Sequence, residues 1–173
     1  MRHTTHDTHD THETHDARRA RRTTRTHPQD QLAALGAMLE RCGAPPNSAA
    51  TLDGDTPFAA REELAERPPP LVVTNPDMLH YTVLPGHTGA WARLLSTVKL
   101  IVIDEAHCYV GAFGTHVAAV LRRLGRLAPE AHYFLCSATV RNPGEHARRL
   151  LPPSPRELRV VDADGSPRGP KQV

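Results

Sequence analysis

Apolar and polar residues alternate along the middle of the chain in a pattern that predicts strands and helices in turn. Short apolar runs typical of buried strands occupy residues 49–52, 71–73, 99–103 and 132–135. Helical periodicity or helix-start signals mark residues 30–42, 56–67, 75 onward, 113–127 and 142 onward. Because the two kinds of segment alternate, we expect an α/β fold with a mainly parallel sheet packed between helices.

Capping residues mark the ends of several predicted helices. Thr56-Pro57, Asn75-Pro76 and Asn142-Pro143 each place an N-cap residue before a proline, which is favoured in the first helical turn. Glu145 adds a capping-box-like feature to the last of these, and Gly43 stands where a C-terminal cap belongs. These signals give the predicted helices defined boundaries.

The predicted helix at residues 113–127 has one apolar face and one basic face. The residues expected in the core are Phe113, Val117, Val120, Leu121 and Leu124. The residues expected to face outward are Arg122, Arg123 and Arg126. This helix is therefore expected to cover one face of the sheet.

Both ends of the chain depart from the pattern. Residues 1–27 form a low-complexity arm, predicted to be disordered, in which an arginine-rich stretch follows a histidine tract: His3, His6, His9, His12 and His15. The alternative interpretation of this tract is weak capture of Zn²⁺ or Ni²⁺. Residues 152–173 form a tail rich in Pro, Gly and Arg, with a possible short strand at 157–161. The domain expected to fold is 28–151.

Composition limits the possible classes of protein. The chain has 173 residues, enough for one domain, and a net charge of +2, which indicates no global field for a nucleic acid or a membrane. No apolar run approaches the roughly 18 residues that a membrane helix needs. Its 3 cysteines form no CxxC pair, so neither a zinc site nor a disulfide framework is indicated. We expect a cytoplasmic protein that does not bind membranes.

Polar residues follow three of the predicted strands. Thr74-Asn75, Asp104-Glu105 and Ser137-Ala138-Thr139 each come directly after an apolar run. In a parallel sheet these strand ends meet at one edge, where ligands usually bind. Adjacent carboxylates repel each other unless a divalent cation and a water lie in front of them. One acid can then hold Mg²⁺ through water while the other orients an attacking water.

These motifs resemble those of the superfamily 2 DEAD/DEAH-box helicases. Asp104-Glu105-Ala106-His107 is similar to motif II in its DEAH form, and Ser137-Ala138-Thr139 to motif III, the SAT tripeptide. Order and spacing fit the first RecA-like domain over residues 29–151 and are closest to the bacterial MrfA (YprA) type of DNA helicase. The resemblance implies catalytic roles for Asp104 (holding Mg²⁺ through water), Glu105 and His107, with motif III coupling ATP hydrolysis to movement.

The same resemblance implies a nucleic-acid-binding edge. Thr74, Asn75, Pro76 and Asp77 are similar to motif Ib, which grips the nucleic-acid backbone. Gln31 falls at the end of motif Ia, and Gly54 and Arg61 fall where a further strand-gripping element lies. The resemblance therefore implies DNA contacts at seven residues: Gln31, Gly54, Arg61, Thr74, Asn75, Pro76 and Asp77. DNA, single-stranded or at a duplex end, is preferred over RNA as the expected partner.

One expected element of an ATP site is missing from the sequence. A P-loop needs G-x-x-x-x-G-K-[ST], whose amides cradle phosphates and whose lysine reaches them. The only lysines are Lys99 and Lys171, and residues 1–23 contain no glycine. We therefore expect a fragment of a helicase that requires the missing part or a second copy as partner, and that neither binds ATP and Mg²⁺ nor hydrolyses ATP alone.

Two other functions are compatible with the sequence. A non-catalytic nucleic-acid-binding or regulatory module with a decayed ATP site explains the missing lysine. A metal-handling or interaction protein explains the histidine- and arginine-rich arm. A Walker A sequence or a second RecA-like domain in the neighbouring reading frames would favour the helicase fragment over both.

Overall fold

Helices and strands alternate along the chain, as the apolar pattern predicts. The computed structural model describes the backbone of residues 28–163 and 165 and the side chains from residue 32 onward. The elements are α2 Pro28–Arg41, β1 Ala49–Leu52, α3 Phe58–Glu66, β2 Leu71–Thr74, α4 Pro76–Met78, the π-helical turn η1 Leu79–Val83, α5 Ala92–Thr97, β3 Leu100–Ile103, the 3-10 turn η2 Ala106–Cys108, α6 Gly111–Leu127, β4 His132–Leu135 and α7 Pro143–Leu150. The predicted arm at 1–27 and its histidine tract lie outside the described residues.

The strands pair in parallel, which confirms the predicted α/β class. In the described part of the chain they form two two-stranded sheets, β1–β2 and β3–β4. Ala49 pairs with Leu71 at the start of the first sheet, and Leu100 with His132 at the start of the second. The register brings the carboxyl ends of β1 and β2 together, and likewise those of β3 and β4.

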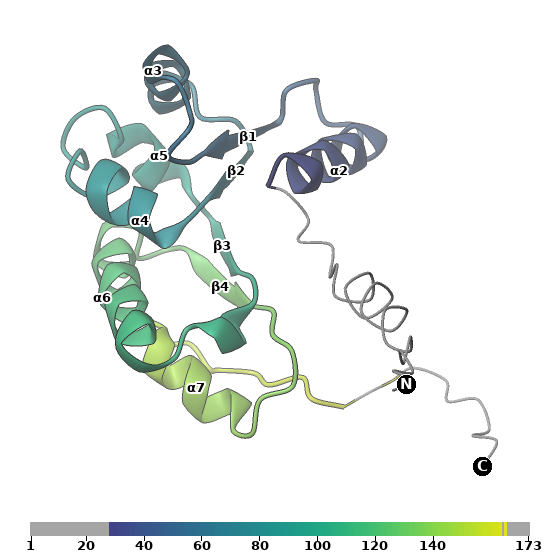
Figure 1. Ribbon diagram of the computed structural model, residues 1–173, viewed down its shortest axis with the longest axis vertical. Helices are drawn as coiled ribbons and strands as arrows, with labels where there is room; N and C mark the ends of the chain where they lie inside the picture. Colours follow the sequence, from purple (N-terminus) through teal and green to yellow (C-terminus); the bar gives the residue numbers. More distant parts are fainter. Residues whose placement is uncertain (1–27, 164, 166–173) are drawn as a thin grey trace, which may run out of the picture.

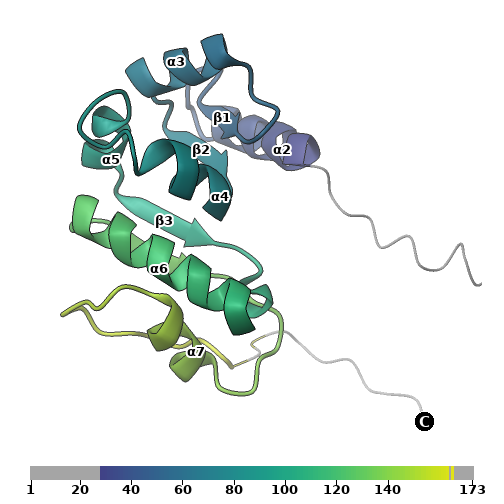
Figure 2. The ribbon, with the colours of Figure 1, turned by 60° about the vertical axis from the view of Figure 1, so that its left-hand side comes forward.

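The helices pack mainly on one side of the strands. Figures 1 and 2 show α4, α5 and α6 on the same side, with β1, β2 and β3 following one another behind them in Figure 2. One core cluster spans both sheets, from Leu52 in β1 through Ile103 in β3 to Leu150 in α7. Val117 and Val120 of α6 are almost fully buried in it. This shared core makes the partial domain one body.

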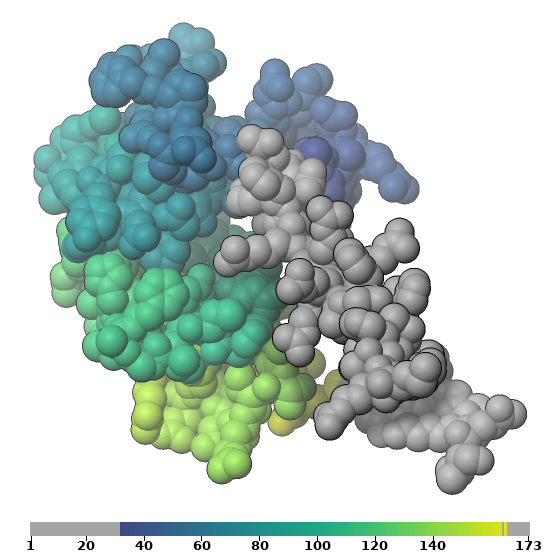
Figure 3. Space-filling view, viewed as in Figure 1, coloured from purple at the N-terminus to yellow at the C-terminus, as the bar shows by residue number. Residues whose placement is uncertain are grey.

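Helix α2 stands apart from this core. It packs against β1, and Figures 1 and 3 show it to one side of the block formed by the other helices. Its apolar residues Leu35 and Met38 are 37% and 63% exposed, so the apolar face that the sequence predicts has little to cover it. Gly43, with φ +87°, adopts the left-handed conformation expected of a C-terminal cap.

Three local predictions are wrong, and a fourth, for Asn142, holds only in part. Thr56 is not the N-cap of α3; Pro57 occupies that position and the Thr56 hydroxyl bonds to Asp53 instead. Phe113 is 51% exposed, because it lies in the first turn of α6 and outside the core cluster. Asn142 is the predicted N-cap of α7, but its side chain makes no capping hydrogen bond to the backbone and donates to Glu145 instead. No strand forms at 157–161, where the backbone has no neighbouring strand to pair with in the described part of the chain.

One face of the β3–β4 sheet lacks a covering layer. Leu100, Val102 and Phe134 share this face and are 57%, 54% and 59% exposed. Ile103 and Leu135, on the opposite face, pack into the core under α6. The apolar pattern along β3 therefore corresponds to a strand that is buried on one face only.

Candidate functional site

The acidic pair lies in an exposed turn directly after β3. Asp104 and Glu105 are both exposed, and Asp104 Oδ1 accepts a hydrogen bond from the Glu105 N–H at 2.9 Å. The turn is held to the neighbouring strand by the Ala106 N–H, which donates to the Cys136 carbonyl at 2.9 Å. Sheet pairing thus continues past the end of β3 and fixes the backbone that carries the acids.

Glu105 adopts an unusual backbone conformation. Its φ of 49° and ψ of 41° lie in the left-handed region, which disfavours residues with a side chain. Such strain persists only where surrounding contacts impose it, and it is concentrated at functional sites. Here the neighbouring Ala106 is bound to β4, and this contact holds the turn in place.

His107 joins the acidic turn to the segment after β4. Its Nδ1 lies 3.2 Å from Glu105 Oε2 and 3.3 Å from the backbone nitrogen of Ala138. A single ring nitrogen cannot donate to the carboxylate and accept from the amide at the same time. In this arrangement Nδ1 accepts the Ala138 N–H and does not donate to the Glu105 carboxylate, which stays free to accept a proton elsewhere.

The tripeptide after β4 is exposed. The Ser137 hydroxyl donates to the Ala138 carbonyl at 2.8 Å, and Thr139 lies in the adjoining exposed loop. The structure therefore brings the two predicted motifs, at residues 104–107 and 137–139, into direct contact. The link runs through His107 and the backbone of Ala138.

A tyrosine follows the turn and is affected by it. Burial, with smaller contributions from Cys108 and Asp104, raises the pKa of the Tyr109 hydroxyl above its usual value of 10.0. Its ring packs against that of Phe113, with centroids 5.6 Å apart. Tyr109 thus remains a neutral side chain beside the acids at neutral pH.

The described residues do not by themselves fit a resident magnesium ion. They contain no group of three or more His, Cys, Asp or Glu side chains placed to hold a metal. Asp104 offers one carboxylate in which one oxygen already accepts the Glu105 N–H. Mg²⁺ is usually held by one or two carboxylates together with phosphates and waters. The prediction that Asp104 holds Mg²⁺ through water thus concerns an ion that arrives with a nucleotide, and it stays a prediction.

A second group of predicted residues lies at the ends of β1 and β2. The Thr74 hydroxyl donates to the Leu52 carbonyl at 2.8 Å, which ties the end of one strand to the other. Asn75 Oδ1 accepts the Met78 N–H at 2.9 Å and caps α4, with Pro76 in the first turn. Asp77 is exposed in that turn. The capping role predicted for Asn75 is confirmed.

Gly54 and Arg61 belong to the loop that follows β1. Gly54 is exposed, whereas Arg61 is half-buried and donates to carbonyls of the same loop. Gln31 lies in α2, and its side chain is outside the described residues. The structure therefore forms two clusters, one at the end of each sheet: residues 53–61 with 74–77, and residues 104–107 with 137–139.

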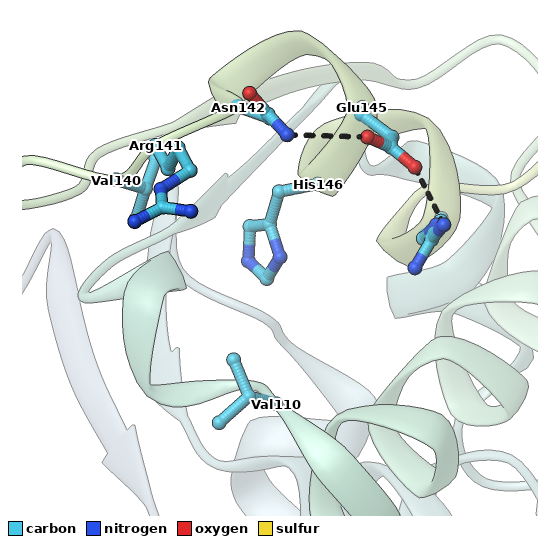
Figure 4. Close-up of a pocket in the computed structure, with 7 residues that line it drawn as sticks. Val110, Val140, Arg141, Asn142, Glu145 and His146 are labelled. Atoms are coloured by element: carbon cyan, nitrogen blue, oxygen red, sulfur yellow. Dashed lines mark hydrogen bonds and ion pairs between the residues drawn. The ribbon is translucent and has the colours of Figure 1, made fainter.

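A pocket of about 250 Å³ lies beside the second cluster (Figure 4). Its lining residues are Val110, Val140, Arg141, Asn142, Glu145, His146 and Arg149. None of the acids of the 104–107 turn lines it, so we do not regard it as the site of chemistry. His146 projects toward this pocket from α7, and its Nε2 donates to the Ala106 carbonyl at 2.7 Å.

Sequence reasoning missed two residues that organise these clusters. His146 carries no recognisable sequence signal, because its contact with Ala106 joins positions 40 residues apart. Thr56 stands directly before a proline, and this pattern predicts an N-cap. In the structure its hydroxyl instead closes the loop after β1. Both roles depend on how separate segments meet in three dimensions.

The sequence of this chain is similar to those of known helicases. The sequence profile of the DEAD/DEAH box helicase family matches residues 23–146. The uncharacterized ATP-dependent helicase YprA of Bacillus subtilis is 42% identical over 147 residues, which cover 83% of this chain and 19% of that protein. The chain thus spans about a fifth of the length of this relative.

Solved structures share the fold as well as the sequence. The crystal structure of the DUF1998 helicase MrfA bound to DNA and AMPPNP has a TM-score of 0.70 and 40% identity, covering 80% of this chain and 19% of that one. The Mycobacterium smegmatis helicase Lhr, bound to ssDNA and AMP-PNP, has a TM-score of 0.51 and 32% identity, covering 69% of this chain and 16% of that one. The described α/β unit therefore matches a small part of larger helicases.

Proposed function

This chain belongs to the DEAD/DEAH box helicase family, and on that premise we propose that it forms part of the first RecA-like domain of an ATP-dependent DNA helicase. The contact between His107 Nδ1 and the Ala138 backbone nitrogen, at 3.3 Å, carries the proposal. It joins the acidic turn to the tripeptide after the neighbouring strand, so a change at one is transmitted to the other. The alignment of the family profile with residues 23–146 supports the same assignment.

We assign Glu105 to the water that attacks the nucleotide. Its carboxylate is exposed at the carboxyl edge of β3–β4, where a ligand can approach. His107 Nδ1 accepts from Ala138 and so does not donate to Glu105, which leaves the carboxylate free to orient the water and take its proton. Asp104 beside it would hold, through water, the cation that arrives with the nucleotide, and Ser137 and Thr139 would belong to the coupling segment.

We assign DNA binding to the 53–61 and 74–77 segments. Both follow strands of the β1–β2 sheet, and the Thr74–Leu52 hydrogen bond joins them into one edge. Gly54 is exposed and has no heavy atom within 4 Å of the position of an added Cβ, so a nucleic-acid backbone can approach closely there. The structures of MrfA and Lhr bound to DNA support DNA as the partner.

A charge-insertion experiment tests the DNA-binding edge. Gly54→Asp places a negative charge on the proposed edge, and Gly36→Asp places one on α2; an added Cβ meets no other atom within 4 Å at either position. Fluorescence anisotropy with labelled single-stranded DNA should show about fivefold weaker binding for Gly54→Asp, equivalent to roughly 1 kcal/mol of repulsion. Gly36→Asp should bind like the unaltered chain. Equal effects of both substitutions would contradict the proposed edge.

The second candidate function is a non-catalytic nucleic-acid-binding or regulatory module. The absence of a G-x-x-x-x-G-K-[ST] sequence from the 173 residues favours it for this chain alone. On either function we expect no DNA-stimulated ATP hydrolysis by the isolated chain, because nothing in its sequence cradles the triphosphate. Turnover at the roughly 1–10³ s⁻¹ typical of enzymes, abolished by Glu105→Gln, would contradict this expectation.

A further inference from the structure

The loop between β1 and α3 is closed by one arginine. Arg61, on α3, donates from Nε to the Thr56 carbonyl at 2.7 Å, and from Nη2 to the Gly54 carbonyl at 2.9 Å and the Asp53 carbonyl at 3.2 Å. Three carbonyl oxygens of one short loop thus point to a single guanidinium. Its planar fork matches several acceptors at once, which a lysine ammonium cannot do in the same geometry.

Side chains within the loop complete the closure. The Thr56 hydroxyl accepts the Asp53 N–H at 2.9 Å and donates to Asp53 Oδ1 at 2.8 Å. Asp53 Oδ1 also accepts the Asp55 N–H at 3.1 Å. The polar groups of Asp53 and Thr56 are therefore used to shape the loop, which leaves Gly54 as its exposed tip.

Carbonyl oxygens repel a phosphate. In this loop, Arg61 donates to three of them and so offsets their negative charge. We propose that Arg61 is a positioning residue that shapes the 53–56 loop for a nucleic-acid strand and does not itself bind phosphate. This inference rests on the proposed function of the β1–β2 edge, and it reassigns a residue expected from its sequence position to contact DNA directly. Within the described residues, Nη1 makes no hydrogen bond. The experiment must therefore test whether Nη1 binds a phosphate.

Salt dependence separates the two roles. A phosphate ligand contributes about 0.7 to the slope of log affinity against log salt for single strands, whereas a positioning residue contributes none. We expect Arg61→Lys and Arg61→Ala to weaken single-stranded DNA binding to a similar extent, by about tenfold or more, because both lose charge-assisted hydrogen bonds. The salt slope should stay unchanged in both. If Arg61→Lys retains affinity and Arg61→Ala loses slope, Arg61 is a phosphate ligand and the proposal is wrong.

Hydrogen exchange tests the loop without DNA. Exchange at the Asp53 and Asp55 amides should be faster in both Arg61 variants of the full chain, while the denaturant midpoint shows that the fold is kept. Arg93→Lys is the matched control, because Arg93 is exposed on α5 and its side chain makes one hydrogen bond, of 3.3 Å, to the Glu66 carbonyl. It should change neither exchange in the loop nor DNA affinity.

The two measurements fail independently. If the unaltered chain does not bind single-stranded DNA, the proposed function fails, and the exchange experiment still decides whether Arg61 shapes the loop. Unchanged loop exchange in Arg61→Lys would overturn the inference even if DNA binding is found.

Discussion

Glu105 combines an exposed carboxylate with a left-handed backbone. The carboxylate serves the proposed function, whereas the backbone conformation lowers the stability of the fold. The φ of 49° costs free energy that a glycine would not lose. The carboxylate of this side chain is the group that we propose orients the attacking water. Function at this position is therefore expected to be maintained at the expense of stability.

Replacing Glu105 with glycine should stabilise the fold. We expect Glu105→Gly to raise the free energy of unfolding by about 1 kcal/mol relative to Glu105→Gln, since only glycine relieves the backbone strain. Urea denaturation of the two variants measures the difference. Glu63→Gly, in the interior of α3, is the control and should lower stability by about 1 kcal/mol. A lower stability of Glu105→Gly than of Glu105→Gln would show that the turn is not strained.

Tyr133 makes stability depend on alkaline pH. Its hydroxyl is buried without a hydrogen-bond partner in the described structure, and burial raises its pKa from 10.0 to about 12. Above pH 10 the unfolded chain loses this proton before the folded chain does, so the free energy of unfolding falls as pH rises from about 10 to 12. Because the ring is only half-buried, we expect a loss of about 1–2 kcal/mol across this range.

Tyr133→Phe tests this explanation. The variant should lack that part of the alkaline decrease and should be as stable as the unaltered chain, or more stable, near neutral pH, because it removes an unpaired polar group. Denaturant midpoints of both proteins at several pH values measure the effect. Parallel pH profiles would mean that the Tyr133 hydroxyl finds a partner in solution.

At the scale of elements, the close approach of α6 to the turn before it positions the acidic pair. An added Cβ at Gly114 would lie 2.3 Å from the Tyr109 carbonyl oxygen, so the backbone after η2 crosses the first turn of α6 at this glycine. Ala106, at the start of η2, is held by both Cys136 and His146. The segment from Ala106 to Gly114 is therefore fixed at both ends, and the acidic turn adjoins it.

Gly114→Ala should displace this segment. We expect a loss of stability of about 2–3 kcal/mol, because the methyl group meets backbone that a rotamer change cannot move. Gly36→Ala is the matched helical control: it has no atom within 4 Å and should stabilise α2 by about 0.5–1 kcal/mol. Thermal melting compares the two. A neutral effect of Gly114→Ala would show that the backbone around Tyr109 is free to move.

At the scale of the whole molecule, the described unit has a core on one side and exposed apolar strands on the other. Val102 and Phe134 lie on the uncovered face of β3–β4, and β4 has β3 as its one partner in the described part of the chain. Such faces and edges promote association. We propose that the rest of the helicase, or a second copy of the chain, covers this face. Covering about 400 Å² of apolar surface contributes on the order of 10 kcal/mol.

The isolated chain should therefore self-associate. We expect size-exclusion chromatography to show a concentration-dependent shift that is weakened by Val102→Thr combined with Phe134→Thr. The unfolding midpoint should change little, because both side chains are more than half exposed. Val161→Thr is the control, since Val161 is 93% exposed in an extended segment outside the sheets. A monodisperse monomer that melts above about 60 °C would show that the fold is closed without a partner.

None of the helices in the part of the chain that the structure describes is long and apolar enough to cross a bilayer.

The local features of this protein were determined by the sequence itself. The four strands were predicted to within one residue of their observed ends, and Gly43 and Asn75 act as the predicted cap residues. These features follow from side-chain size, β-branching and capping chemistry, which act over a few neighbouring residues. The juxtaposition of the acidic turn with the tripeptide after β4 followed from parallel pairing of their strands.

Only the tertiary structure decided the contacts that depend on how distant segments meet. The His146–Ala106 hydrogen bond, the exposure of Val102 and the division into two small sheets have no local cause in the sequence. Arg61 is the sharpest case, because an arginine at that position reads equally well as a phosphate ligand until its three carbonyl partners are seen. A guanidinium binds whichever acceptors the backbone presents, and the start of this loop is fixed by the pairing of β1 with β2.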